Sequence, residues 1–284
     1  MSININILGD FCPIGKLESS KYQNNINWLG DLKTILQESD FNIVNLEYPL
    51  TNVNNKIRKS GPHLKASPET VEILNKIGIN VVTLTNNHIM DYGEEGFFDT
   101  INTLKKYNVQ YVGAGKDIQE ARKPLILCKE GSKIAIVNFC EKEFSIATDN
   151  SPGAAPLDLI WNFEDIQKAK NMADYVIVIV HGGAENYQYP TPRQVKTYRF
   201  FASLGICAVI GHHSHCIQQW EEYNGVPICY SLGNFVFDEK NNPDSWFKGL
   251  LISLTPQKPS TLIKIYPFTI VLIPSILLMQ VIII

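Results

Sequence analysis

Several features that mark common protein classes are missing from this sequence. None of its six cysteines forms a Cys-x-x-Cys pair, which argues against a zinc ribbon or a dithiol redox motif. The formal net charge is -3, and lysine and arginine form no run, so nothing favours nucleic acid as a partner. The N-terminal residues "MSININILGD" do not show the basic and then apolar segments of a secretory signal peptide. These absences predict an ordinary globular protein of the cytoplasm.

The C-terminal residues "YPFTIVLIPSILLMQVIII" are almost entirely apolar. A membrane-spanning helix needs about 20 apolar residues, and Pro274 interrupts this run. We therefore divide the chain into a main domain, residues 1–255, and a tail, residues 256–284. Three interpretations of the tail stay open: a terminal pair of strands, a membrane anchor that would make the protein membrane-associated, or a truncated or aberrant end of the same domain.

The main domain alternates short β-rich runs with amphipathic helical patterns, which is typical of an α/β fold with crossover connections. Several of the runs are continuously apolar, as in strands that are covered on both faces. Strands are predicted near the N-terminus and over 41–46, 79–84, 109–114, 133–139, 175–180 and 206–211. Helices are predicted over 67–78, 94–108 and 191–205, and residues 140–160 form the longest loop-like stretch.

Unusual polar residues directly follow these predicted strands. In open α/β sheets, ligands bind beyond the carboxyl ends of the strands, so side chains at these positions meet at one edge. The residues concerned are Asp10, Asn45, Glu47, Asn86, Asn87, His88, His181, His212, His213 and His215. Acids, amides and imidazoles from five separate strands therefore predict one shared site.

Three of the six histidines fall within the segment "GHHSH", residues 211–215. On an extended segment, positions i and i+2 share a face, so His213 and His215 could reach one metal ion. The alternative is that histidines here hydrogen-bond the backbone or face solvent, as imidazoles in cores often do. The other strand-end residues favour metal binding for His213 and His215. His212 points the other way and is expected to be structural.

The segment "TNNHIMDYG" adds two candidate functional residues. Asn87 can give a metal its side-chain oxygen, and His88 can act as a general acid toward a leaving group. For Asn86 and Asp91 we prefer local roles in a turn and a helix cap.

Two further residues are candidates for substrate binding. Lys65, in the polar loop "SGPHLKASPE", could neutralise an anionic substrate, although an exposed lysine is more often only a solvated charge. Asn234, in "YSLGNFVFD", is either a turn residue or a substrate contact.

Taken in order, the motifs resemble those of the CapA family of capsule and poly-γ-glutamate biosynthesis proteins. They are "GD" near the N-terminus, "NLEYPLT", "TNNHIMDYG", "HGGAENY", "GHHSHCIQ" and "YSLGNFVFD". The family is similar to calcineurin-like metallophosphoesterases. The resemblance implies an α/β fold of the metallophosphatase type, a four-layer α/β/β/α sandwich with a metal centre at one sheet edge.

The resemblance also implies roles for individual residues. It places six ligands around two divalent ions, Mn, Zn or Fe, which would activate a bridging water for attack on phosphorus. The implied ligands are Asp10, Glu47, Asn87, His181, His213 and His215, with His88 as the catalytic acid or transition-state donor.

This sequence departs from the family pattern in several places. The superfamily's opening Asp-x-His is Asp10-Phe11-Cys12 here, so one histidine ligand is absent. The usual His-Trp-Gly is His181-Gly182-Gly183, which removes an aromatic wall beside the site. The usual N-terminal anchor or export signal is not visible, and the apolar tail stands where further strands are expected.

Three functions follow from these observations. The first is a metal-dependent hydrolase of capsule, polyglutamate or exopolysaccharide biosynthesis that acts on an anionic polymer or its phosphorylated precursor. The second is a non-catalytic binding component of a membrane-bound polymer synthesis or export complex. The third is a metal-dependent hydrolase of γ-glutamyl amide links, because metal-activated water also attacks carbonyl groups.

Overall fold

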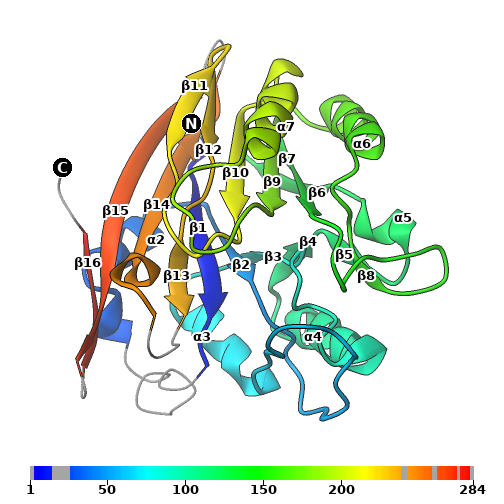
Figure 1. Ribbon diagram of the computed structural model, residues 1–284. Coiled ribbons are helices and arrows are strands. Elements are labelled where there is room, and N and C mark those ends of the chain that lie inside the picture. Colours follow the sequence, from blue (N-terminus) through cyan, green and yellow to red (C-terminus); the bar gives the residue numbers. More distant parts are fainter. Residues whose placement is uncertain (1–2, 15–25, 238–241, 258–260, 274–275, 282–284) are drawn as a thin grey trace.

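Two β-sheets face each other, and helices cover their outer faces (Figure 1). The computed structural model describes residues 3–14, 26–237, 242–257, 261–273 and 276–281. The first sheet has the strand order β16-β15-β14-β1-β2-β3-β4, and β13 also pairs with β1. Its strands are β1 (Ile5–Cys12), β2 (Phe41–Leu46), β3 (Val81–Thr83), β4 (Gln110–Val112), β13 (Asn234–Phe237), β14 (Lys248–Thr255), β15 (Leu262–Ile273) and β16 (Ile276–Val281).

The second sheet has the order β11-β12-β10-β9-β7-β6. Its strands are β6 (Leu125–Lys129), β7 (Ser132–Cys140), β9 (Tyr175–His181), β10 (Ala208–His212), β11 (Trp220–Tyr223) and β12 (Val226–Cys229). A small separate sheet pairs β5 (Ala114–Gly115) with β8 (Gly153–Ala154). In both large sheets the central strands run parallel, namely β1, β2 and β3 in the first and β7, β9 and β10 in the second.

Helices pack on the outer face of each sheet. Helices α2 (Leu32–Gln37), α3 (Val71–Lys76) and α4 (Gly93–Lys106) cover the first sheet, and α5 (Ile118–Ala121), α6 (Leu159–Met172) and α7 (Pro192–Ser203) cover the second. Short 3-10 helices are η2 (Ile26–Leu29), η3 (Pro68–Thr70) and η4 (Asp244–Phe247). Leu32, Leu74 and Phe97 belong to one apolar cluster with β2, whereas Ile166 and Phe201 belong to another with β9 and β10.

A third apolar cluster fills the space between the two sheets. Ile5 and Ile7 of β1 pack there with Ile177 of β9 and Ile210 of β10, and all four side chains are fully buried. The central strands of each sheet are therefore buried on both faces, which explains why their sequences are almost continuously apolar. The α/β/β/α sandwich that the resemblance implied is confirmed.

The apolar tail forms strands of the first sheet. Strand β15 pairs antiparallel with β14 from Lys248↔Thr269 to Thr255↔Leu262, and β16 pairs with β15. Among the three interpretations, the pair of terminal strands is thus the one the described residues adopt; Pro274 lies outside them. No helix in the described part of the chain is long and apolar enough to cross a membrane.

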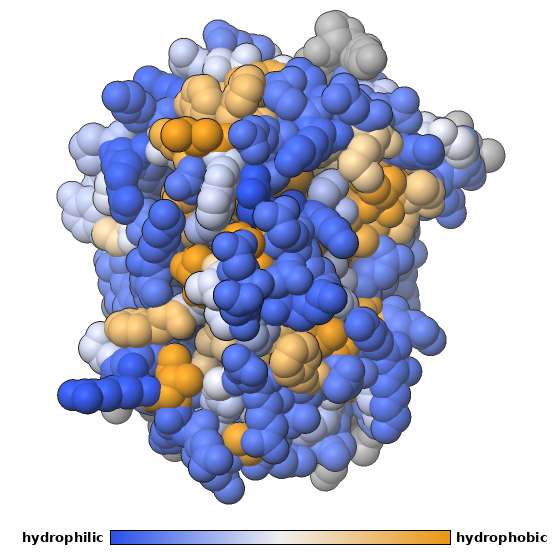
Figure 2. Space-filling model, turned by 90° about the vertical axis from the view of Figure 1, so that its right-hand side faces the viewer, coloured by the Kyte–Doolittle hydropathy of each residue, from blue (hydrophilic) through white to orange (hydrophobic). Residues whose placement is uncertain are grey.

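Helix α6 was not among the predicted helices. Asp158 caps it by accepting hydrogen bonds from the backbone N–H groups of Ile160 and Trp161. Leu159, Ile160 and Trp161 are exposed in its first turn, which obscures the apolar periodicity of a surface helix. Figure 2 shows the side of the molecule where α5 and α6 lie, with apolar patches scattered among hydrophilic residues.

Candidate metal centre

The predicted strand-end residues meet at one edge of the sandwich. Asp10 lies near the end of β1, Glu47 directly follows β2, and His181 is the last residue of β9. The backbone N–H of His213, just past β10, donates to Asp10 Oδ2 at 3.1 Å and joins the two sheets at this edge. The carboxyl ends of the parallel strands thus bring these side chains together, as the sequence predicted.

One group of donor atoms surrounds the His181 imidazole. His181 Nε2 lies 3.0 Å from His213 Nδ1, 3.1 Å from Asn87 Oδ1 and 3.7 Å from Glu47 Oε1. Ligands about 2.1 Å from one ion lie about 3.0–3.5 Å from each other in octahedral or tetrahedral geometry. The spacing of these four atoms therefore fits a single divalent cation.

A second group consists of Asp10, Glu47 and His215. His215 Nε2 lies 3.6 Å from Glu47 Oε1, and His215 Nδ1 lies 3.5 Å from Asp10 Oδ2. His215 Nδ1–H donates to Asn234 Oδ1 at 3.0 Å, which leaves Nε2 as the nitrogen with a free lone pair. Glu47 belongs to both groups, so it is placed to serve two neighbouring cation positions.

Burial shifts the protonation of these groups in a way that a cation would reverse. Burial raises the pKa of Asp10 to about 7, although hydrogen bonds from Asn45 and from the His213 N–H act against it. Burial, and then the charge of Asp10, raise the pKa of Glu47 well above its ordinary value. Glu47 Oε1 is buried and accepts no hydrogen bond from any described residue. A divalent cation would supply the partner that Glu47 Oε1 lacks and would compensate the charge of both carboxylates.

The imidazoles are held in the neutral form that binds metals. Burial lowers the pKa of His213 to about 4 and that of His215 to about 3. Burial, and then the neighbouring histidines, lower the pKa of His181 well below its ordinary value. Neutral imidazole nitrogens and carboxylate oxygens suit Mn, Zn and Fe. These residues therefore fit a divalent metal centre.

Comparison with known proteins identifies the family of this chain. The sequence profile of the bacterial capsule synthesis protein PGA_cap matches residues 4–239. The chain belongs to the PGA_cap family. It is 37% identical over 213 residues to the PGA biosynthesis protein CapA of Bacillus subtilis (strain 168), an alignment that covers 73% of this chain and 56% of that protein.

Further relatives extend the comparison. The chain is 34% identical over 213 residues to the capsule biosynthesis protein CapA of Bacillus anthracis, covering 72% of this chain and 52% of the relative. It thus spans about half the length of these curated relatives. A crystal structure of a hypothetical protein from Thermus thermophilus aligns with a TM-score of 0.57 at 13% identity, over 94% of this chain and 99% of that one, and shows the shared fold.

Asn45 is a residue of this PGA_cap site to which the sequence analysis gave no role. Its Nδ2 lies 2.7 Å from Asp10 Oδ1, 3.2 Å from His181 Nδ1 and 3.5 Å from Glu47 Oε2. Asn45 thus contacts candidate ligands from three different strands or strand ends and links them to one another. Its place two residues before Glu47 was a usable signal, because alternate residues of a strand share a face.

A second set of polar side chains surrounds His88. His88 Nδ1–H donates to Asp91 Oδ2 at 2.8 Å, and Lys59 forms a buried ion pair with Asp91. Asp91 also accepts a hydrogen bond from the backbone of Leu64 at 2.7 Å. The preferred local role for Asp91 was therefore too narrow, since its carboxylate orients His88. Lys59 was not among the predicted site residues.

The two predicted substrate-binding residues lie in different surroundings from those expected. Lys65 Nζ donates to the carbonyl oxygen of Val53 at 2.6 Å and to Asn54 Oδ1 at 2.8 Å, and it does not line the cleft at the site. Asn234 is fully buried; besides accepting from His215, it donates to the carbonyl oxygen of Trp246 at 3.0 Å. Asn234 thus orients His215, and among the described residues the lysine side chain that lines the cleft is Lys59.

The backbone of the histidine segment differs from the extended form that the sequence analysis assumed. Strand β10 ends at His212, and His213 and His215 have φ angles of 95° and 54°. Such values are uncommon for residues other than glycine and often occur at functional sites. His212 is buried with Nε2 3.1 Å from the Leu8 carbonyl oxygen, which is the structural role expected. Cys12 lies in the apolar cluster beneath the helices of the first sheet.

A cleft of about 400 Å³ leads from solvent to this site. The polar residues that line it include Lys59, Asn87, His88, Glu143, Glu185 and His215. Trp246 packs against the His215 ring with the ring centres 4.6 Å apart. A substrate in the cleft would therefore meet the candidate metal ligands Asn87 and His215 as well as His88 in its lining.

Proposed function

We propose that this chain is a metal-dependent hydrolase of capsule or poly-γ-glutamate biosynthesis. The observation that carries the proposal is the convergence of six oxygen and nitrogen donors, with the buried Glu47 Oε1 lacking a hydrogen bond from any described residue. The names of the two Bacillus relatives supply the biosynthetic context. The partners would be an anionic polymer or its phosphorylated precursor and the membrane-bound complex that makes it.

The proposed centre holds two ions, each with its own donors. His181, His213 and Asn87 would bind one ion, Asp10 and His215 the other, and Glu47 would bridge them. When bound, such ions supply Lewis acidity and a nucleophile at neutral pH. The donor set suits Mn, Zn or Fe.

The chain's own residues would handle the leaving group. The hydrogen bond from His88 Nδ1 to Asp91 fixes the ring and leaves Nε2 as the nitrogen available to the cleft that His88 lines. In the imidazolium form of the ring, Nε2–H can protonate the leaving oxygen or nitrogen while Nδ1–H stays bonded to Asp91. Lys59 pairs with Asp91 in a buried position and so holds the carboxylate that orients His88.

A γ-glutamyl amide is the second candidate for the bond that is cleaved. Lys59 is the one lysine or arginine among the described residues that line the cleft, and Asp91 already pairs with it. Glu143 and Glu185 add negative charge to the same lining. This charge distribution disfavours a dianionic phosphomonoester and favours a bond within a diester or an amide.

The test combines metal analysis with a panel of substrates. The wild-type protein should purify with, or take up, a divalent metal and should cleave a phosphodiester or poly-γ-glutamate in preference to a phosphomonoester. His213→Ala should lose both properties, whereas His63→Ala, which removes a histidine outside the site, should keep them. Metal binding without any turnover would favour the non-catalytic role, and a His213→Ala protein indistinguishable from wild type would overturn the metal centre.

A further inference from the structure

A third possible set of metal ligands lies at the mouth of the cleft. Glu185, His213 and His215 offer ligand atoms within 4.8 Å of one another. The Glu185 side chain is 55% exposed, whereas both histidines are buried. Glu185 and His215 also line the cleft that opens to solvent. A cation coming from solvent would thus meet this outer set before the inner groups.

The loop that carries Glu185 is anchored on both of its sides. The backbone N–H of Asn186 donates to the Ser214 carbonyl oxygen at 2.8 Å, which ties the loop to the histidine segment. The buried Gln218 side chain donates to the carbonyl oxygen of Tyr187 at 2.8 Å. On the other side, the Gly182 N–H donates to the His212 carbonyl oxygen at 3.2 Å. These bonds hold Glu185 beside His213 although its own side chain faces solvent.

The outer set is spaced more widely than the inner one. Glu185 Oε1 lies 4.0 Å from His213 Nε2, compared with 3.0 Å between His213 Nδ1 and His181 Nε2. Ligands of one ion at about 2.1 Å can be 4.0 Å apart only if they are nearly opposite each other. Closer coordination would need the exposed Glu185 side chain to move. The outer position therefore suits brief binding, not permanent residence.

His213 cannot serve both positions at once. Its Nδ1 faces the inner group and its Nε2 faces Glu185, and a neutral imidazole has one lone pair. Occupation of the outer set thus precedes or follows occupation of the inner set. The buried Glu47 Oε1 accepts no hydrogen bond from a described residue. Pairing this oxygen with the cation is favourable, so the cation is expected to move from the outer set to the inner one.

We propose that Glu185 is a capture ligand: together with His213 and His215 it binds an incoming divalent cation at the cleft mouth and passes it to the inner centre. This proposal rests on the metal centre proposed above. Glu185 then sets the rates of metal uptake and release and contributes little to the final affinity. The transfer needs no redox step, because the cation only exchanges carboxylate and imidazole ligands.

Stopped-flow uptake of Co²⁺, followed by the visible absorption of the bound ion, tests the proposal. Glu185→Gln should lower the association and dissociation rate constants by about tenfold each while the equilibrium affinity stays within about threefold. Glu143→Gln removes an equal charge from the same cleft and is the matched control. It should leave the association rate within about twofold of wild type, because it is not a ligand.

Four results would overturn the proposal. Equal slowing in the Glu143→Gln and Glu185→Gln proteins would mean that only the charge of the cleft matters. A large loss of affinity in Glu185→Gln at an unchanged association rate would make Glu185 a resident ligand. Failure of the wild type to take up Co²⁺ would remove the metal centre itself, whereas normal wild-type uptake that Glu185→Gln does not alter would remove the capture role alone.

Discussion

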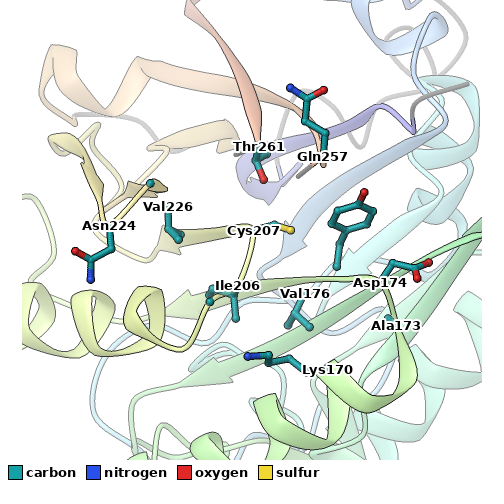
Figure 3. A pocket seen from close by; sticks show the side chains of 13 residues that line it. Lys170, Ala173, Asp174, Val176, Ile206, Cys207, Asn224, Val226, Gln257 and Thr261 are labelled. Atoms are coloured by element: carbon teal, nitrogen blue, oxygen red, sulfur yellow. The ribbon is translucent and has the colours of Figure 1, made fainter. Parts of the chain in front are cut away.

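Two cavities of similar volume lie at opposite ends of the parallel strands β9 and β10. The cleft of about 400 Å³ is at their carboxyl ends, where His181 and His212 end the strands. The other cavity, of about 460 Å³, is at their amino ends and is lined by residues such as Lys170, Asp174 and Cys207 (Figure 3). Volume alone does not tell which of the two is functional.

The two cavities differ in how their charged groups are satisfied. At the amino ends, the exposed Lys170 donates to the Leu204 carbonyl oxygen at 2.6 Å, and Asp174 accepts the Lys133 N–H at 2.8 Å. At the carboxyl ends, Asp10 and Glu47 are fully buried, and Glu47 Oε1 accepts no hydrogen bond from a described residue. Buried charge without compensation is costly and usually persists for a function. This difference favours the cleft at the carboxyl ends of the strands as the candidate site.

Glu47→Gln should give the largest effect, because it removes the buried carboxylate that distinguishes the two cavities. Metal affinity should fall by more than the about 10–100-fold that is typical when only a supporting partner of a ligand is removed. The free energy of unfolding of the metal-free protein should rise by about 1 kcal/mol, since a buried carboxylate has been removed. Calorimetric metal titration and chemical denaturation measure the two quantities. Unchanged metal binding would contradict the role of Glu47, and Asp174→Asn in the other cavity is the control.

Asn234→Ala should give the next largest effect. Without the acceptor for Nδ1–H, the His215 ring loses its fixed orientation, and metal affinity should fall by about 10–100-fold. Asn234→Asp keeps an oxygen that accepts this hydrogen bond and should retain most of the affinity. Metal titration of both variants measures the difference. Equal losses in the two would indicate a general packing defect in place of an orienting role.

Metal affinity should increase with pH as Asp10 loses its proton. Because the pKa of Asp10 is raised to about 7, a cation must displace a proton from it below that pH. A single group of this kind gives about a tenfold gain in affinity between pH 6 and pH 8. Calorimetry in buffers of different ionisation enthalpy should record more proton release at pH 6. Affinity that does not change with pH would contradict this expectation.

In the metal-free protein, Asp10 and the two histidines His213 and His215 change the stability in opposite directions as the pH rises. Between pH about 4 and 7, native Asp10 holds a proton that the unfolded chain has lost, so its pKa shift makes stability fall as pH rises. The pKa values of His213 and His215 are lowered to about 4 and 3, so their contributions rise with pH up to about 6.5. Denaturation of metal-free protein should therefore show partial cancellation below pH 6.5 and falling stability just above it.

Lys170→Met should give the smallest effect. It removes one surface hydrogen bond in the amino-end cavity, so the free energy of unfolding should change by less than about 1 kcal/mol. Metal affinity and turnover should not change. A loss of metal affinity or turnover, measured beside wild type, would show that the amino-end cavity takes part in the function. The function would then not be confined to the cleft at the carboxyl ends of β9 and β10.

The central parallel strands of the two sheets could be predicted because their local sequence decides them, whereas strands such as β6 and β11–β14 were not predicted. β2 has the predicted bounds, 41–46, since an apolar run stands between polar turn residues. Helix α6 was missed because Leu159 and Ile160 are exposed at its start, so the helical period is hidden. The pairing of β15 with β14 depends on contacts in the folded sheet, and the sequence left it as one of three alternatives.

The site was predictable where its residues follow strands and not where they come from loops. Asp10 and His181 lie at strand ends, so the strand pattern placed them. Lys59 and Lys65 stand in one loop, and only tertiary hydrogen bonds decide that Lys59 reaches His88. Glu185 likewise depends on backbone bonds of its loop to the histidine segment, which no local pattern reveals.

Anomalous diffraction from crystals grown with Mn²⁺ tests the metal centre most directly. We expect a peak within about 2–2.5 Å of Glu47 Oε1 and of ligand nitrogens of His181 and His213, and a second one near Asp10 and His215. The cavity at the amino ends of the strands should show none. Ordered side chains at saturating Mn²⁺ with no peak beside Glu47, or a peak only in the other cavity, would contradict the metal centre proposed here.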